Sequence, residues 1–125
     1  MQLFEWAPED ATVNLCMGAA YLQHACSRTV GDRHACVLKA LAFFCRHASF
    51  CPHRQQAAFN LGRAMHQLGM NSFAATWYER ALVLGMGLPA EDSLSFEAGH
   101  NLALLYEESG SGLLARHVRN LYCSV

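Results

Sequence analysis

The chain has 125 residues, of which 53% are hydrophobic and 15% charged, and its formal net charge at pH 7 is −1. This length suits one domain, and the apolar fraction excludes intrinsic disorder. The balanced charge argues against a nucleic-acid footprint over the whole surface. The longest run without a polar residue or glycine, residues 40–45, is far below the roughly 20 residues of a membrane span.

Residues 11–51 predict a loosely patterned pair of helices. Gly18 and Tyr21 fall in the first helix, and Asp32 is a candidate N-cap for the second. Apolar residues at helical spacing predict the buried face of the second helix. They are Val37, Leu38, Leu41, Phe44 and Cys45.

Residues 52–89 predict the clearest helical hairpin. Pro52 suits a helix start after a cap at Cys51, and Gly69 suits a left-handed stop. Asn71 is a candidate cap for the second helix, which Gly85 ends. The apolar faces consist of Ala58, Leu61, Gly62, Met65 and Leu68 in the first helix, and of Phe73, Ala74, Trp77, Tyr78, Ala81, Leu82 and Leu84 in the second.

Residues 94–125 repeat this pattern. Gly110 is the expected stop of the first helix and Ser111 the expected cap of the second. The apolar faces consist of Leu102, Ala103 and Tyr106, and then of Ala115, Val118, Leu121 and Tyr122. In both hairpins a small residue precedes an alanine by twelve positions, as Gly62 precedes Ala74 and Ala103 precedes Ala115. We expect the paired helices to approach closely there.

The six cysteines are expected to be free thiols, because no secretory signal is visible. Cys45, His47, Cys51 and His53 are candidate zinc ligands, although their i,i+2 spacing departs from the usual ligand spacings. The sequence contains no GxSxG, Walker or HExxH motif. We therefore expect no enzymatic activity and no cofactor.

Taken together, the helix pairs resemble the tetratricopeptide repeat, a unit of about 34 residues. Counted from Gln55, the matches at positions 7, 8, 20, 24 and 27 are Leu61, Gly62, Ala74, Tyr78 and Ala81. The resemblance implies an all-α superhelix of about three hairpins. We expect a single domain over residues 1–125, with a divergent repeat at 11–51, the best-matching repeat at 52–89 and a C-terminal repeat at 94–125.

Several segments resemble one particular repeat-containing family more closely than they resemble the general repeat pattern. Residues 59–69, 74–82, 101–106 and 121–125 resemble the carboxyl-terminal repeats of the large subunit of RNA polymerase III transcription factor IIIC. That resemblance implies a nuclear scaffold for transcription initiation at tRNA-type promoters. Its expected partners are other factor IIIC subunits and components of initiation factor IIIB, with DNA touched only indirectly and no membrane or small-molecule substrate. The chain would then be part of a longer protein.

In such repeats the first helices line the binding wall. Phe59 suits an apolar side chain of a partner, or packing under a missing cover, and Arg63 suits a carboxylate, or plain solvation. The expected groove residues, at positions 2, 5, 9 and 12 of two repeats, are Gln56, Phe59, Arg63, His66, Glu97, His100, Leu104 and Glu107.

Three alternatives remain open. A co-chaperone-like adaptor would need lysine at position 5 and asparagine at position 9, whereas position 5 holds Leu15, Phe59 and His100. A small zinc-stabilised domain would use the four ligand candidates and would contain stoichiometric zinc. Direct DNA binding would use the basic segment 24–66 and would depend steeply on salt.

Overall fold

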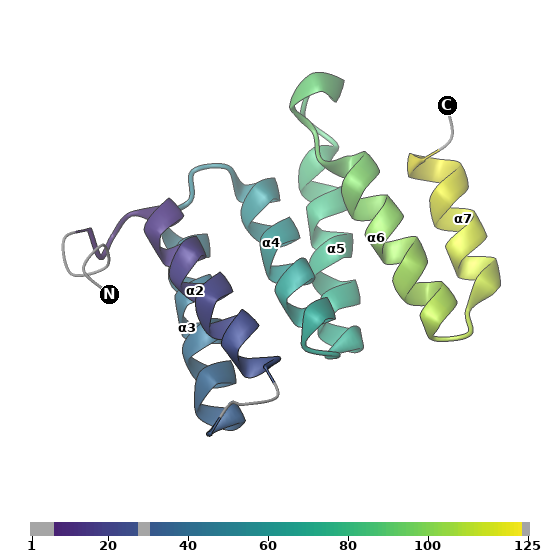
Figure 1. Ribbon diagram of the computed structural model, residues 1–125. Helices are drawn as coiled ribbons and strands as arrows, with labels where there is room; N and C mark the ends of the chain where they lie inside the picture. The colour runs from purple at the N-terminus through teal and green to yellow at the C-terminus, as the bar shows by residue number, and fades with distance from the viewer. Residues whose placement is uncertain (1–6, 28–30, 124–125) are drawn as a thin grey trace. The chain divides into compact units, whose positions relative to one another are not determined.

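The computed structural model describes residues 7–27 and 31–123, and its elements are helical (Figure 1). Ser124 and Val125, the end of one segment that carries the resemblance, lie outside the described residues. No strand occurs in the described ranges, so the prediction of an all-α fold of paired helices is confirmed. No helix among these residues is long and apolar enough to cross a membrane.

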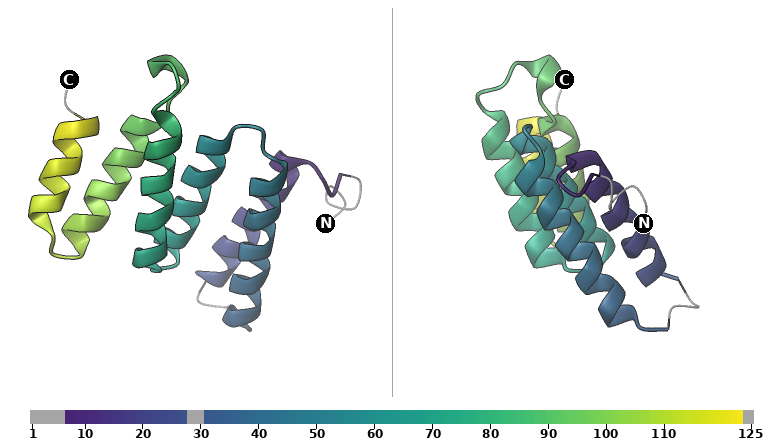
Figure 2. Two further views of the ribbon diagram at one scale, coloured as in Figure 1. Left: turned by 180° about the vertical axis from the view of Figure 1, so that it is seen from behind. Right: turned by 90° about the vertical axis from the view of Figure 1, so that its left-hand side faces the viewer.

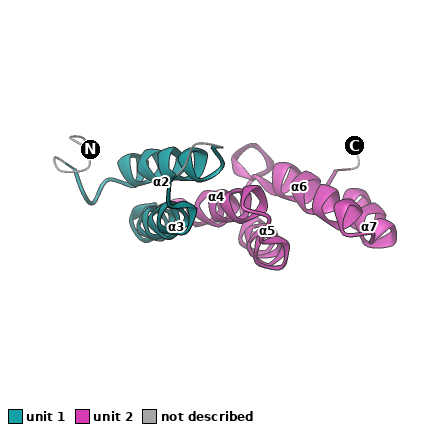
Figure 3. Ribbon diagram, turned by 60° about the horizontal axis from the view of Figure 1, so that its bottom comes forward, with its two compact units in different colours: residues 1–52 teal, residues 53–125 magenta. Residues whose placement is uncertain are grey.

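The chain divides into two compact units, residues 1–52 and 53–125 (Figure 3). The first contains α2 (Ala11–Ala25) and α3 (Arg33–Phe50), which pack against each other as an antiparallel pair (Figure 2). The second contains α4 (Arg54–Gln67), α5 (Asn71–Gly85), a short 3-10 helix (Ala90–Asp92), α6 (Ser95–Glu108) and α7 (Gly112–Tyr122). Within it α4 pairs with α5, α5 packs on α6, and α6 pairs with α7. The single domain predicted over residues 1–125 stays a prediction.

In the first unit, small residues bring α2 and α3 together. A Cβ atom on Gly18 would lie 3.2 Å from the ring of Phe44, which is buried. Asp32 caps α3 as predicted, since its carboxylate accepts a hydrogen bond from the Ala35 N–H at 3.1 Å. The predicted inward position of Leu38 is wrong, because this side chain is 55% exposed.

Leu38 is exposed because fewer positions of α3 are buried than the apolar pattern predicts. Its buried residues are Ala40, Phe44 and His47, spaced by four and three positions. A ring nitrogen of His47 lies 2.8 Å from the carbonyl oxygen of Ala11, so a polar side chain fills part of the contact with α2. Cys45, also predicted inward, is exposed.

The helix ends of the second unit confirm the glycine stops and correct two caps. Gly69 and Gly110 have φ of +78° and +81°, a conformation that glycine adopts without strain. α4 begins at Arg54 rather than at Pro52, since its cap is His53, whose Nδ1 accepts from the Gln56 N–H at 3.0 Å. Asn71 is already helical and follows an N-cap residue, Met70, that makes no side-chain cap bond.

One apolar cluster holds the second unit together. A Cβ atom on Gly62 would lie only 2.7 Å from the ring of Tyr78, so this glycine lets α5 place an aromatic residue against α4. Phe73 and Leu121, predicted inward, are 58% and 59% exposed, because neighbouring residues of their helices occupy the contact faces. The buried cluster comprises Ala58, Ala74, Tyr78, Ala81, Leu82, Ala98, Leu102, Ala103, Leu105, Ala115 and Val118.

A buried amide ties the loop before α6 to the first hairpin of the second unit. The Gln55 side chain donates to the Ala81 carbonyl at 3.0 Å and to Ser95 Oγ at 3.3 Å. Its Oε1 accepts from the Leu94 N–H at 2.8 Å. Gln55 is 2% exposed. Its buried amide, which donates twice and accepts once, therefore joins α4, α5 and the start of α6.

Candidate protein-binding site

Residues from three helices of the second unit converge on an open hollow of about 230 Å³. α4 contributes Arg63, His66 and Gln67, which share a helix face because they are three and four positions apart. α5 contributes Tyr78, and α6 contributes Asn101. The hollow is therefore lined mainly by polar groups, at the point where the first helices of the two hairpins come near each other.

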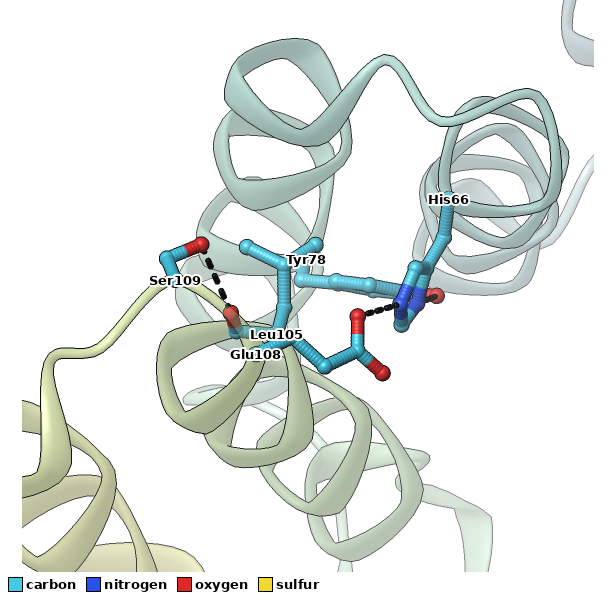
Figure 4. A network of polar contacts seen from close by, with 5 residues as sticks. All are labelled: His66, Tyr78, Leu105, Glu108 and Ser109. Atoms are coloured by element: carbon cyan, nitrogen blue, oxygen red, sulfur yellow. Dashed lines mark hydrogen bonds and ion pairs between the residues drawn. The ribbon is translucent and has the colours of Figure 1, made fainter.

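A short chain of polar contacts fixes one wall of this hollow (Figure 4). His66 Nδ1 lies 3.3 Å from the Tyr78 hydroxyl, and His66 Nε2 lies 3.1 Å from the Glu108 carboxylate. When Nε2 carries the proton, His66 donates to Glu108 and accepts from Tyr78. This imidazole thereby links α4 to both α5 and α6.

The electrostatics of the wall keep Tyr78 neutral. Burial raises the pKa of Tyr78 to about 12, against a weaker opposite effect of the Asn101 side chain and the Arg63 charge. The carboxylate of Glu108 adds to the increase. Tyr78 therefore remains a hydroxyl donor at neutral pH.

Arg63 offers a cation at the rim. The side chain is exposed, and its guanidinium carbon lies 5.8 Å from the centre of the Phe59 ring. The Phe59 ring in turn lies 6.1 Å from that of Tyr78. Among the residues that the structure describes, Arg63 has no acidic side chain within ion-pair distance. A planar guanidinium held on an aromatic ring can form two parallel hydrogen bonds with a carboxylate.

The other groove residues expected from the sequence take several positions. Phe59 is half-buried against the core, Leu104 is half-buried, and Gln56 and Glu97 are exposed. The His100 ring stacks on that of Phe96 with centroids 6.5 Å apart.

Glu107 faces α7, where it pairs with Arg119, and this hydrogen bond lowers the pKa of Glu107. Of the eight expected residues, the structure thus places Arg63 and His66 at the hollow.

Asn101, Gln67 and Tyr78 were missed as site residues. The repeat pattern assigns Tyr78 to the core and treats an asparagine at the position of Asn101 as ordinary. Asn101 comes close to Arg63 only because α6 packs beside α5, and no local motif marks that proximity. Asn101 and Arg63 occupy positions 6 and 9 of successive repeats, and the structure brings both to the hollow.

The four zinc-ligand candidates have other surroundings. His47 is buried against α2, His53 caps α4, Cys45 is exposed, and Cys51 is the C-cap of α3. Across residues 7–27 and 31–123, no three His, Cys, Asp or Glu side chains come together closely enough to hold a metal ion.

Comparison with known proteins gives three related sequences. No protein-family model matches the chain. It is 31% identical over 131 residues to human general transcription factor 3C polypeptide 3, which covers all of the chain and 15% of that protein. It is 31% identical to the transcription factor tau 131 kDa subunit of Saccharomyces cerevisiae, over 99% of the chain and 12% of the relative.

The third is transcription factor tau subunit sfc4 of Schizosaccharomyces pombe, at 31% identity over 92% of the chain and 13% of that subunit. The chain therefore spans between about an eighth and a seventh of the length of these relatives. All three carry the name of a transcription factor, and the two yeast proteins are named as its subunits. The resemblance expected from the sequence motifs is confirmed: this chain is related, over essentially its whole length, to part of the large subunits of transcription factor IIIC, or tau.

Proposed function

We propose that the chain is a protein–protein interaction scaffold of a transcription factor IIIC complex, which supports initiation by RNA polymerase III at tRNA-type promoters in the nucleus. The relationship to general transcription factor subunits over essentially the whole chain supports this assignment. The partners are other factor IIIC subunits and components of factor IIIB, and DNA is reached only through them.

The observation that carries the proposal is the polar hollow, at whose rim the Arg63 guanidinium has no acidic partner among the residues that the structure describes. Its volume of about 230 Å³ admits one side chain rather than a large ligand. Arg63, Asn101 and Gln67 supply hydrogen-bond donors, and the ring of Phe59 restricts the guanidinium. These groups suit an aspartate or glutamate on a partner segment that lies along α4 and α6.

A charge reversal tests the hollow. Arg63→Glu is expected to reduce capture of purified factor IIIC or IIIB components by the full chain on the order of tenfold, because it puts a carboxylate against the partner's carboxylate. Arg54→Glu is the matched control, since Arg54 is also an exposed arginine of α4 but does not line the hollow. Circular dichroism checks that helix content is unchanged. Equal capture by the two variants would refute the assignment of the hollow.

A further inference from the structure

His66 stands in the middle of a chain of hydrogen bonds that runs along one side of the hollow (Figure 4). Its Nε2 lies 3.1 Å from the Glu108 carboxylate, and its Nδ1 lies 3.3 Å from the Tyr78 hydroxyl. The Tyr78 hydroxyl is also hydrogen-bonded to the Asn101 side chain. Side chains of α4, α5 and α6 are thereby linked in one line, which ends at Asn101 in the lining of the hollow.

While His66 is neutral, each hydrogen bond of this chain has a fixed direction. The ionised Glu108 can only accept, so Nε2 carries the proton and Nδ1 accepts the single proton of the Tyr78 hydroxyl. The Tyr78 oxygen is then left as an acceptor, and Asn101 donates one N–H to it. Burial raises the pKa of Tyr78 and the Asn101 side chain lowers it, which agrees with a hydrogen bond donated to the phenolic oxygen.

A second proton on His66 reverses two of these hydrogen bonds. Both ring nitrogens of an imidazolium are donors, so Nδ1 then donates to the Tyr78 oxygen. Tyr78 is 1% exposed, and a buried hydroxyl proton without an acceptor is costly. The acceptor at hand is the carbonyl oxygen of the Asn101 side chain, which meets the hydroxyl once the amide turns over. Both N–H groups of Asn101 are then released from Tyr78.

Charged groups from two helices act on His66. Glu108 of α6 attracts an imidazolium, and Arg63 of α4, which lines the same hollow, repels it. The titratable group that α5 places beside His66 is Tyr78, which stays neutral. A histidine side chain changes its charge between about pH 5 and 8, and the reversal is to be sought in that range.

We propose that His66 is a proton-controlled switch of the hollow: on protonation it reverses the hydrogen bonds along Tyr78 and Asn101 and frees a further N–H of Asn101 for a ligand. The hollow then gains a positive charge and a donor, so it holds a partner's carboxylate more tightly at lower pH. This last step rests on the proposed function of the hollow, whereas the reversal of the hydrogen bonds does not.

Nuclear magnetic resonance of the full chain tests the reversal. The side-chain N–H signals of Asn101 are expected to shift together with the ring signals of His66 as pH falls from about 8 to about 5. Tyr78→Phe removes only the hydroxyl, so the Asn101 signals should no longer follow His66. His100→Gln is the matched control, because His100 precedes Asn101 in the chain but stacks on Phe96, and the Asn101 response should remain.

Formate, a small carboxylate that stays ionised in this range, tests the effect on binding. Titrations are followed at the guanidinium signals of Arg63 at constant ionic strength. The affinity is expected to be about fivefold higher at about pH 5.5 than at about pH 7.5, because one positive charge is added close to the ligand. His66→Gln cannot take up a proton, so its affinity should be equal at both pH values.

The outcomes separate the switch from the proposed function. Asn101 signals that ignore the titration of His66, or that still follow it in Tyr78→Phe, would overturn the reversal. Equal formate binding at both pH values, or a pH dependence that persists in His66→Gln, would overturn the control of binding by His66. Formate binding at neither pH, while Asn101 follows His66, would instead refute the hollow as a carboxylate site.

Discussion

Gly62→Ala tests the close approach between α4 and α5. The new Cβ atom would lie 2.7 Å from two ring carbons of Tyr78, well inside van der Waals contact. The ring cannot easily retreat, because it is 1% exposed, packs on Phe59 and is hydrogen-bonded to His66. Overpacking of this kind costs about 1–3 kcal/mol, and alanine recovers about 1 kcal/mol of helix propensity. The difference of these two terms is a fall in the free energy of unfolding of up to about 2 kcal/mol, measured by urea denaturation followed by circular dichroism.

Gly112→Ala provides the matched control, because a Cβ atom there would meet nothing within 4 Å. Its free energy of unfolding should stay the same or rise by a few tenths of a kcal/mol. Tyr78→Leu removes the opposing ring, so the double variant should recover most of the cost of Gly62→Ala. If Gly62→Ala is as stable as Gly112→Ala, or if its cost persists without the ring, the proposed packing of Gly62 against Tyr78 is refuted.

Two further predictions concern buried polar groups of the second unit. Gln55→Leu should lower the free energy of unfolding by about 1–3 kcal/mol in the same urea assay, because it leaves the part-buried N–H of Leu94 without its acceptor; an unchanged midpoint would contradict this. Burial raises the pKa of Tyr78 and of Tyr106 to about 12, helped at Tyr106 by its bond to Glu79. Since the unfolded chain loses these protons near pH 10, the stability present below pH 10 should be lost as pH rises toward 12. Phenolate absorbance on folded protein checks this, and Tyr78→Phe should remove part of the late-ionising signal.

Local patterns predicted most of the helix pairs, because they depend on residues close in sequence. Gly69 and Gly110 end helices since the left-handed conformation suits glycine, whatever the surroundings. The Asp32 cap likewise needs only the next three residues. The prediction failed where local rules allow more than one helix start. At α4 the sequence favours a start at Pro52, whereas the ring nitrogen of His53 caps a helix that begins at Arg54.

The sequence by itself determined that the chain consists of helical hairpins and that it is related to the large subunits of transcription factor IIIC. Both follow from local features, namely periodic apolar residues, glycine stops and shared segments. Only tertiary structure decided which polar groups meet. Asn101 reaches the hollow of Arg63 because α6 packs on α5, and Glu107 turns to Arg119 because α7 packs on α6. Contacts between residues far apart in sequence depend on how whole helices pack, and that packing is settled by the entire buried cluster rather than by any one segment.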